Sequence, residues 1–260
     1  MFKNLKGKTV FITGASAGIG EACAQAFASA GCHIILTARR TKRIEELKAE
    51  LDQQYPDIRT LAVTLDVTSK EAVDQVVTNL PADFQSVDIL INNAGLVLGL
   101  TPLADYPVDQ IDTMINTNVK GLIYCTQAFI PRMKQAPRGG HIVNVSSISG
   151  REVYPNGSVY CATKHAVDVI TRTLRFELAD SPIRVSSINP GLVETEFSKV
   201  RFEGDQQRAD QVYAGMTPLT GSDIAELAVF ITSRPAHVEI ADTLILPHGQ
   251  ASATFVHRQK

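Results

Sequence analysis

The sequence predicts an α/β protein built around one doubly wound, parallel β-sheet. Short runs of apolar and β-branched residues recur along the chain, as buried strands require. Segments with helical periodicity separate these runs, and no linker, low-complexity segment or internal repeat divides the chain. This alternation is typical of a sheet of about seven parallel strands with helices on both faces. We therefore expect all 260 residues to form a single domain.

The expected elements follow one another from the first residues to the last. Apolar runs predict strands at 8–13, 33–38, 60–65, 87–91, 141–145, 183–188 and 241–246. Periodic segments predict helices up to Ala30, at 41–54, 69–80, 158–179 and 222–232, and in a long region after Asp105 that breaks near Pro131. The last of these helices is expected to begin at an N-cap serine or aspartate. A polar excursion over about 191–217 has the length of a lid or binding loop.

Composition excludes several classes of function. The hydrophobic fraction of 44% and charged fraction of 20% are ordinary for a globular domain. A net charge of -2 without a basic tract argues against a nucleic-acid partner. No apolar run is long enough to cross a membrane, and the first residues lack the apolar region of a signal peptide, so we expect a cytoplasmic protein.

Cysteine and histidine usage gives no sign of a metal site. The cysteines show no ligand spacing and are expected to be small, buried, reduced side chains; they are Cys23, Cys32, Cys125 and Cys161. The six histidines form no metal-binding motif. We therefore expect no bound metal.

A glycine-rich turn follows the first predicted strand and precedes a helix. Gly14, Gly18 and Gly20 are spaced as GxxxGxG. Glycine permits a tight turn and a close approach of the backbone to a diphosphate, and the N-terminus of the following helix offers free N–H groups. The turn therefore predicts a Rossmann-type dinucleotide site, although a plain strand-to-helix turn would have the same appearance.

The end of the second predicted strand indicates which dinucleotide is bound. Ala38 stands where an acidic residue would bond the ribose hydroxyls of NAD, and Arg39 and Arg40 follow it. Arginine at this place accommodates the 2′-phosphate of NADP. The sequence therefore favours NADP(H). Arg40 has an alternative interpretation as the solvated start of the next helix.

Polar residues at other strand ends are further candidates, because ligands bind at the carboxyl edge of a parallel sheet. Asn93 follows the fourth strand and either fixes the local turn or contacts the cofactor, and the two roles are compatible. Ser146 and Ser147 follow the fifth strand, where a serine can also simply end the strand. Asn118 and Gly121 lie inside a helical region and lower its helix propensity, which suggests a local distortion that frees a carbonyl for water.

Tyr160 and Lys164 are four residues apart in a predicted helix, so their side chains lie on one face. A lysine held beside a phenol stabilises the phenolate and is expected to lower the tyrosine pKa, giving an acid/base group near neutral pH. By itself the pair is also compatible with an exposed helix surface. Its meaning depends on the glycine turn far upstream.

Taken together, these motifs resemble the short-chain dehydrogenase/reductase family over nearly the whole chain. The matching segments are Gly14-xxx-Gly18-Ile19-Gly20, Asn92-Asn93-Ala94-Gly95, Asn118, Ser147, Tyr160-xxx-Lys164 and Pro190-Gly191-xxx-Thr195. The resemblance implies that Tyr160 is the general acid in reduction and the base in oxidation. It implies that Lys164 tunes Tyr160 and holds the nicotinamide ribose, that Ser147 bonds the substrate oxygen, and that Asn118 supports a water relay.

The same resemblance implies the residues that line NADP(H) and the assembly state. The implied cofactor residues are Gly14, Ser16, Gly18, Ile19, Gly20, Arg39, Arg40, Asp66, Val67, Asn93, Tyr160, Lys164, Val193 and Thr195. Family members are typically homotetramers packed through the helix that carries the tyrosine, so we expect a homotetramer.

A narrower resemblance lies in the second half of the chain. The segments 190–198, 200–202, 235–237 and 256–258 are similar to those of NADP-dependent 3-hydroxy acid dehydrogenases. These enzymes act on serine, L-allo-threonine and related short hydroxy acids, which are the implied substrates. The carboxylate of such a substrate needs a cation. We expect Arg201, in the expected lid, to bind it together with Ser147 and Tyr160 at the substrate oxygen, and Arg151, four residues beyond Ser147, is the alternative cation.

Two other functions stay open from the sequence. One is an NADPH-dependent reductase of bulkier carbonyls, such as 3-oxoacyl groups or xenobiotic ketones. The other is a non-catalytic NADP-binding regulator on the same fold. The complete set of Asn118, Ser147, Tyr160 and Lys164 argues against the regulator, because a sensor does not need a proton relay.

Overall fold

The computed structural model describes residues 4–259 and contains one sheet of seven strands in that part of the chain. All neighbouring strands are parallel, in the order β3-β2-β1-β4-β5-β6-β7. The strands are β1 (Thr9–Thr13), β2 (His33–Ala38), β3 (Thr60–Thr64), β4 (Ile89–Asn92), β5 (Gly140–Val145), β6 (Ile183–Pro190) and β7 (Asp242–Ile245). The predicted doubly wound sheet is confirmed, and each strand lies where an apolar run predicted it. Of the first residues, 1–3 lie outside the described part.

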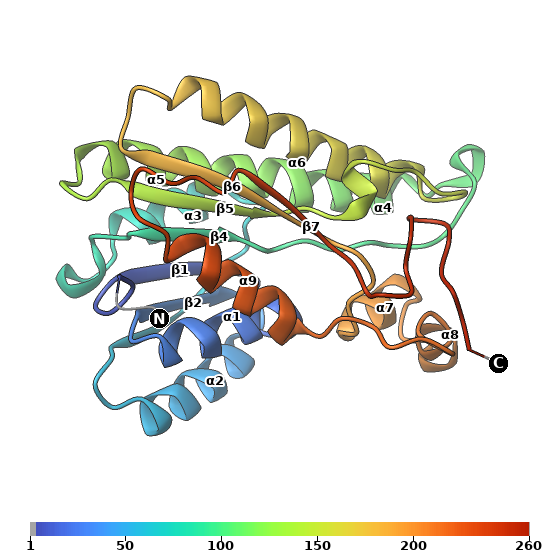
Figure 1. Ribbon diagram of the computed structural model, residues 1–260, viewed down its shortest axis with the longest axis horizontal. Helices are drawn as coiled ribbons and strands as arrows, with labels where there is room; N and C mark the ends of the chain where they lie inside the picture. Colours follow the sequence, from blue (N-terminus) through green and yellow to red (C-terminus); the bar gives the residue numbers. More distant parts are fainter. Residues whose placement is uncertain (1–3, 260) are drawn as a thin grey trace.

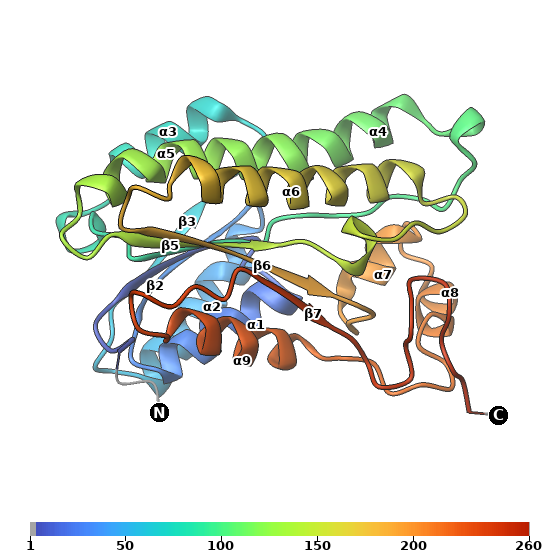
Figure 2. The same cartoon turned by 45° about the horizontal axis from the view of Figure 1, so that its top comes forward.

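Helices cover both faces of the sheet (Figures 1 and 2). One layer holds α1 (Gly18–Ser29), α2 (Thr41–Gln54) and α9 (Gly221–Thr232). The other holds α3 (Lys70–Thr78), α4 (Val108–Ile115), α5 (Leu122–Gln135) and α6 (Ser158–Glu177). Helices between the strands are expected, because parallel strands need crossover connections and these usually contain a helix.

Alternating side chains of the central strands fill two separate cores. Val10 and Ile12 of β1 pack in the core beneath α1, α2 and α9, whereas Phe11 between them packs in the core beneath α3, α5 and α6. Phe11 meets Phe129 of α5 with ring centroids 4.8 Å apart. Fully burying a side chain of this size contributes roughly 1.5–3 kcal/mol. The continuous apolar run of β1 is therefore explained by burial on both faces.

Two predicted boundaries are wrong. The helical region does not break near Pro131, because α5 continues through it to Gln135. The proline removes one N–H group, but Phe129 and Met133 on either side of it are buried in the core and keep the helix regular. The last helix does not begin at a serine or aspartate: its N-cap is Thr220, which forms a capping box with Asp223.

The distortion expected around Asn118 is present. Residues Asn116–Gly121 form a π-helix, η3, between α4 and α5. A π-turn contains an extra residue and is a common device at functional sites. Gly121 is required here, because a Cβ atom would lie 2.7 Å from the side chain of Val67. The turn is therefore packed directly against the loop that follows β3.

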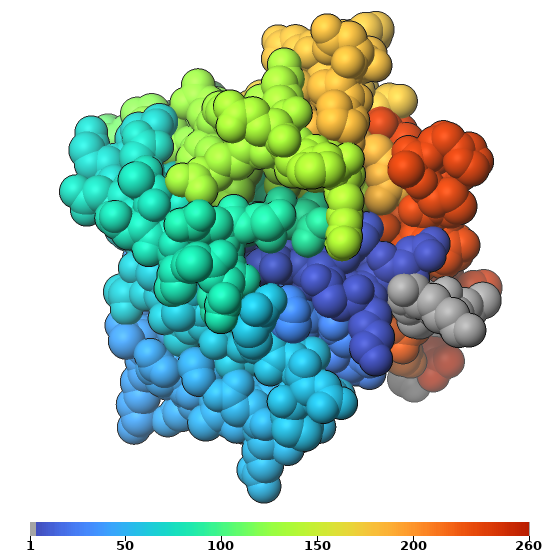
Figure 3. Space-filling view, turned by 90° about the vertical axis from the view of Figure 1, so that its left-hand side faces the viewer, coloured from blue at the N-terminus to red at the C-terminus, as the bar shows by residue number. Residues whose placement is uncertain are grey.

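All parallel strands end at the same edge of the sheet, and this edge carries the polar candidates. Gly14, Arg39, Asp66, Asn93 and Ser146 each follow, within two residues, the strands β1, β2, β3, β4 and β5. Figure 3 shows the opposite end of the molecule, where segments from the early, middle and late parts of the chain share one face. The candidate site thus lies at the carboxyl edge of the sheet, and Figure 3 views the molecule from the opposite edge.

The polar excursion after β6 folds as two short helices, α7 (Glu196–Arg201) and α8 (Gln206–Gln211). Thr195 caps α7 by accepting a hydrogen bond from Phe197 N, and Asp205 caps α8 by accepting one from Arg208 N. A bridge between Val193 and Leu219 closes the base of the segment. Residues 191–217, called the excursion below, therefore stand over the carboxyl edge of the sheet (Figure 1).

Gly20→Ala should destabilise the fold by about 1–3 kcal/mol, because overpacking a tight contact carries this cost. A Cβ atom at Gly20 would collide with the carbonyl oxygen of Gly14 and approach Asn93 Nδ2 to 2.6 Å. Denaturant unfolding followed by circular dichroism measures the change. Gly249→Ala is the control, since its Cβ would meet only His257 O at 3.2 Å. Equal stability of the two variants would contradict the expectation.

Candidate active site

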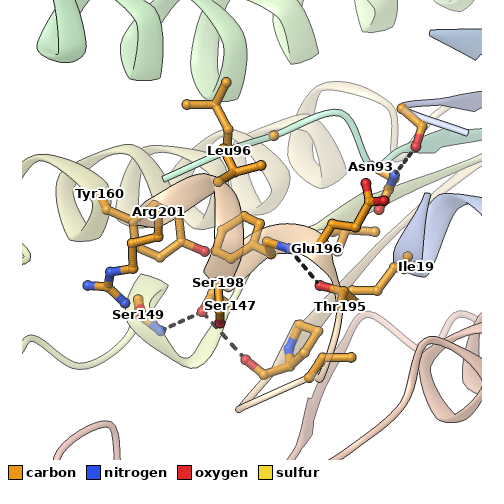
Figure 4. Close-up of a pocket in the computed structure, with 18 of the residues that line it drawn as sticks. Ile19, Asn93, Leu96, Ser147, Ser149, Tyr160, Thr195, Glu196, Ser198 and Arg201 are labelled. Atoms are coloured by element: carbon orange, nitrogen blue, oxygen red, sulfur yellow. Dashed lines mark hydrogen bonds between the residues drawn. The ribbon is translucent and has the colours of Figure 1, made fainter. Parts of the chain in front are cut away.

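One large cavity lies at the carboxyl edge of the sheet, between the strand ends and the excursion. Its volume is about 920 Å³. Figure 4 shows Ser147, Tyr160 and Arg201 toward one side of it and Ile19, Asn93 and Glu196 toward the other. The cavity is lined by most of the predicted residues: Gly14, Ser16, Gly18, Ile19, Arg39, Arg40, Asp66, Val67, Asn93, Ser147, Tyr160, Lys164, Val193, Thr195 and Arg201.

Gly20 and Asn118 are the predicted site residues that lie behind the wall rather than in it. Gly20 supports the glycine turn through its contact with Gly14, and Asn118 is buried. Asn118 Oδ1 accepts a hydrogen bond from Leu96 N at 2.8 Å, while its Nδ2 donates to Leu96 O at 2.8 Å and to Thr163 Oγ1 at 3.1 Å. Asn118 therefore joins the π-turn to the loop after β4 and to α6.

A set of hydrogen bonds between β1 and β4 fixes the glycine turn. Asn93 Nδ2 donates to Thr13 O at 2.9 Å and to Gly14 O at 3.2 Å. In return, Thr13 Oγ1 accepts from Asn93 N at 3.0 Å and from Ala94 N at 2.9 Å. Asn93 thus has the structural role that the sequence left open, and it also lines the cavity.

The glycine turn has the shape of a cradle for a phosphate group. Gly14 and Gly18 adopt φ of +66° and +57°, a conformation that favours glycine. A Cβ atom at Gly14 would lie 3.0 Å from Ala94 Cα, so no side chain fits between the turn and the loop after β4. The first N–H groups of α1 follow directly, and they have no partners within the helix. A dinucleotide diphosphate therefore fits this turn.

Tyr160 and Lys164 lie one turn apart on α6, and both are buried in the cavity wall. Lys164 Nζ donates to Val145 O at 3.0 Å and lies 5.9 Å from the centroid of the Tyr160 ring. Burial lowers the pKa of Lys164 to about 8. The lysine is thus poised to exchange a proton close to neutral pH.

The expectation of a lowered tyrosine pKa is wrong for this structure. Burial raises the pKa of Tyr160, and the nearby Tyr154 raises it further, whereas Ser147 and Arg201 lower it. Desolvation disfavours the phenolate more strongly than the neighbouring groups favour it. Tyr160 is consequently a neutral phenol at pH 7, a form that can donate a proton.

The two serines after β5 have different surroundings. Ser146 Oγ donates to Lys164 O at 3.2 Å and so ties β5 to α6. Ser147 Oγ accepts a hydrogen bond from Ser149 N at 3.1 Å and donates to Pro190 O at 3.5 Å, a long and weak bond. Ser147 is therefore the serine whose hydroxyl is more easily redirected toward a ligand.

The two arginines after β2 both line the cavity, and within residues 4–259 only the Arg40 side chain forms hydrogen bonds or an ion pair. Its Nε donates to Ser16 Oγ at 3.0 Å and its Nη2 donates to Ser16 O at 3.2 Å. Its Nη1 forms an ion pair with Glu196 at 2.8 Å. Arg40 is therefore not merely a solvated helix start, because it connects the glycine turn to the excursion. The Glu196 contact was missed from the sequence.

Arg201 and Arg151, the two candidates for an anionic substrate group, lie in different places. Arg201 lines the cavity, where its Nη2 donates to Tyr154 Oη at 2.9 Å and its Nε donates to Gly99 O at 3.4 Å. Arg151 forms an ion pair with Asp242 and is not among the residues that line the cavity. The structure therefore brings Arg201, and not Arg151, to the same cavity as Tyr160.

The last residues of the described chain complete one wall of the cavity, which the sequence did not predict. Gln250 Oε1 accepts from Leu192 N at 2.8 Å, and Ala253 N donates to Glu152 Oε2 at 2.6 Å. Arg258 Nη2 donates to Val212 O at 3.0 Å, at the end of α8. Residues 250–258 thus hold both ends of the excursion.

Tyr154 and Gln250 belong to no sequence motif, so the sequence analysis missed both. The only signal for a role in the site was their position in the loops before α6 and after β7.

The structure also bears on the metal and membrane expectations. In residues 4–259, no three His, Cys, Asp or Glu side chains are grouped so that they could hold a metal ion. Within the same range, no helix is both long enough and apolar enough to span a bilayer. All four cysteines are buried free thiols, as predicted.

Comparisons with known proteins agree with this geometry. The family model described as short chain dehydrogenase matches residues 8–206. The chain is 46% identical over 257 residues to the NADP-dependent 3-hydroxy acid dehydrogenase of Schizosaccharomyces pombe, across 98% of each chain. It is 42% identical over 246 residues to sulfoacetaldehyde reductase 2 of Chromohalobacter salexigens, across 95% of this chain and 96% of the relative.

A solved structure is similar along the whole fold. The closed form of serine dehydrogenase complexed with NADP+ has a TM-score of 0.90 and 41% identity, covering 96% of this chain and 100% of that chain. This chain thus shares its fold with a solved structure that contains NADP+.

Lys164→Met should stabilise the protein by about 2 kcal/mol at pH 7. Below pH 8 the folded protein carries the cost of a buried cation, about 3 kcal/mol for this pKa shift, and methionine removes it while losing the bond to Val145 O. Because the folded pKa lies below the unfolded value of 10.5, the cost is relieved as pH rises from 8 to 10.5. The stability gained by Lys164→Met should therefore shrink toward zero by about pH 10.

Denaturant unfolding at pH 7 and pH 10 measures this difference. Exposed Lys134→Met on α5 is the control and should show no gain that depends on pH. A Lys164→Met variant that is less stable than the wild type at both pH values would contradict the prediction.

Proposed function

Because the chain belongs to the short-chain dehydrogenase family, we propose that it interconverts short 3-hydroxy acids and their 3-oxo acids or semialdehydes with NADP(H). One observation carries this proposal. A single cavity joins the glycine cradle and the two arginines to Ser147, Tyr160, Lys164 and a lid arginine. The names of the relatives, including 3-hydroxy acid dehydrogenase and serine dehydrogenase, support the same chemistry.

NADP(H) fits the residues of the cavity. The turn at Gly14 and Gly18 would hold the diphosphate, and Arg39 and Arg40 would hold the 2′-phosphate. The bound cofactor supplies or accepts the hydride. The remaining proposed contacts are Ser16, Ile19, Gly20, Asp66, Val67, Asn93, Tyr160, Lys164, Val193 and Thr195.

Tyr160 is the proposed proton donor in reduction, and its phenolate form is the proposed proton acceptor in oxidation. As a neutral buried phenol it donates its proton to the carbonyl oxygen, which Ser147 Oγ holds by a second hydrogen bond. Lys164, with a pKa of about 8, can restore the proton to Tyr160. Asn118 bonds Thr163 of α6 and so holds the π-turn beside that helix, and we expect a carbonyl of this turn to bind the water of a relay from Lys164 to solvent.

Arg201 is the proposed partner of the substrate carboxylate. It lies on α7 in the excursion, which acts as the lid over the cavity. Tyr154 and Gly99 occupy two of its donors, so the other N–H groups stay available for an anion. The Arg151–Asp242 ion pair outside the cavity supports this choice over Arg151.

A second candidate is a reductase of bulkier carbonyls. Its support is the apolar part of the wall, formed by Leu96, Leu100, Phe197, Val200 and Phe202. A guanidinium in the same space favours an anionic substrate instead, which agrees with relatives that act on 3-hydroxy acids or sulfoacetaldehyde. The non-catalytic regulator is disfavoured, since Ser147, Tyr160 and Lys164 all line one cavity.

Assembly as a homotetramer in the cytoplasm is part of the proposal. Val169 and Phe176 on α6 are 53% and 85% exposed, and large apolar side chains at the surface of one helix favour contact with another copy of the chain. The mass of the particle in solution, from light scattering, tests the tetramer.

Absorbance at 340 nm should reveal turnover of NADP(H) with serine, L-allo-threonine, 3-hydroxyisobutyrate, 3-hydroxypropionate or malonic semialdehyde. NAD(H) should be a much weaker cosubstrate, and Tyr160→Phe should reduce kcat at least about 100-fold, the usual scale for a general acid. Turnover limited to bulky uncharged ketones would favour the second candidate. NADPH binding without turnover of any carbonyl would favour the regulator.

Arg201→Ala should raise KM for hydroxy acids by about 10- to 100-fold, the value of a charge-assisted hydrogen bond, and should change KM for an uncharged alcohol much less. Steady-state kinetics on the matched substrates measures the difference. Arg208→Ala is the control: this lid arginine stacks 4.4 Å from the Phe202 ring and does not line the cavity. Equal effects of Arg201→Ala on acids and alcohols would refute the role.

A further inference from the structure

The ion pair between Arg40 and Glu196 joins two parts of the site that are 156 residues apart in the sequence. Arg40 follows β2 and Glu196 is the first residue of lid helix α7. The two side chains are about half exposed and both residues line the cavity. The pair therefore lies at the accessible rim of the cavity, close to Ser16 in the glycine turn.

Several N–H groups of the Arg40 side chain already donate hydrogen bonds within the protein. A guanidinium has five N–H groups in a fixed plane. Each of its three nitrogens donates one hydrogen bond, Nε and Nη2 to Ser16 and Nη1 to Glu196, so two N–H groups remain. A phosphate that binds Arg40 must use the remaining N–H groups beside the carboxylate or replace that carboxylate. In either case the phosphate and the carboxylate compete for one cation.

We propose that Glu196 competes with the 2′-phosphate of NADP(H) for Arg40 and thereby limits how strongly the protein prefers NADP(H) over NAD(H). This inference rests on the proposed function, in which Arg40 holds the 2′-phosphate. NAD(H) has no 2′-phosphate, so its binding leaves the Arg40–Glu196 pair intact. The carboxylate is thus a specificity-determining group whose effect is confined to the phosphorylated cofactor.

The same competition couples cofactor identity to the lid. In the described residues the first turn of α7 approaches the glycine turn at two places: through the Arg40–Glu196 pair, and at Thr195, whose side chain would lie 3.1 Å from a Cβ atom added to Gly18. A 2′-phosphate that displaces Glu196 leaves only the second contact. NAD(H) leaves both in place.

Glu196→Gln tests the proposal, with Kd for NADPH and NADH measured by isothermal titration calorimetry at low ionic strength. The variant keeps the shape of the side chain and removes its charge. We expect the Kd for NADPH to fall about two- to five-fold, the range that a half-exposed ion pair supports, and the Kd for NADH to stay unchanged. This gain in NADPH affinity should diminish as salt is added, because salt screens the charge of Glu196 in the wild type.

Two further variants make the measurement specific. Glu194→Gln removes the same charge two residues earlier, where the exposed carboxylate has no ion-pair partner within residues 4–259, and it should leave both Kd values unchanged. In an Arg40→Gln background, adding Glu196→Gln should change the NADPH affinity by less than it does in the wild type. Unfolding curves confirm that each variant is folded.

Three results would overturn the inference. The first is an NADPH affinity that is unchanged or weaker in Glu196→Gln. The second is an affinity gain in Glu196→Gln that is equal for NADPH and NADH. The third is an equal gain in NADPH affinity in Glu194→Gln. An equal gain for both cofactors would mean that the carboxylate acts on the diphosphate that they share. A wild-type protein that binds NADPH no more tightly than NADH would instead refute the cofactor assignment in the proposed function.

Discussion

The hydrogen bonds between Thr13 and Asn93 are the interaction on which the arrangement of the site depends. They join the end of β1 to the end of β4, the place where the strand order changes direction. On one side of this junction lies the glycine turn, and on the other lies the loop that approaches Lys164 and Asn118. Because the residues proposed to bind the cofactor and those proposed to transfer protons are attached to opposite sides, the junction sets the distance between them. A ligand in such an α/β fold binds in the crevice at this point.

The groups around Tyr160 show how the fold stores free energy at the site. A lysine and a tyrosine are buried in the same wall, and burial shifts the pKa of each toward its neutral form. The end of β5 offers each group a partner, Val145 O for the lysine and the Ser147 side chain for the tyrosine, but neither offsets the effect of burial on the pKa. The rest of the molecule offsets the cost through its two apolar cores. In its proposed role Lys164 would serve the chemistry at the expense of stability, as is common in active sites.

Much of this architecture could be predicted, because its determinants are local. Strands buried on both faces are continuous apolar runs, and a diphosphate turn needs glycine at fixed places. Pro131 was misjudged because core packing around Phe129 and Met133, which is a tertiary effect, outweighs the local proline penalty. The pKa of Tyr160 was misjudged because i,i+4 spacing reports a neighbour but not the degree of desolvation. The Glu196–Arg40 and Tyr154–Arg201 contacts join distant segments of the chain, and no local pattern records them.

The π-turn at Asn116–Gly121 has a consequence for insertions and deletions. Such a turn contains one residue more than a regular α-turn, so deleting one residue there could restore an uninterrupted helix from α4 to α5. The residues before the deletion would then rotate by about 100° relative to α5, the angle between successive helical residues. The amide of Asn118 would leave Leu96 and Thr163 while the core contacts of α5 stayed in register. A one-residue deletion that folds cooperatively but has lost its proton transfer would show that this extra residue belongs to the chemistry rather than to the fold.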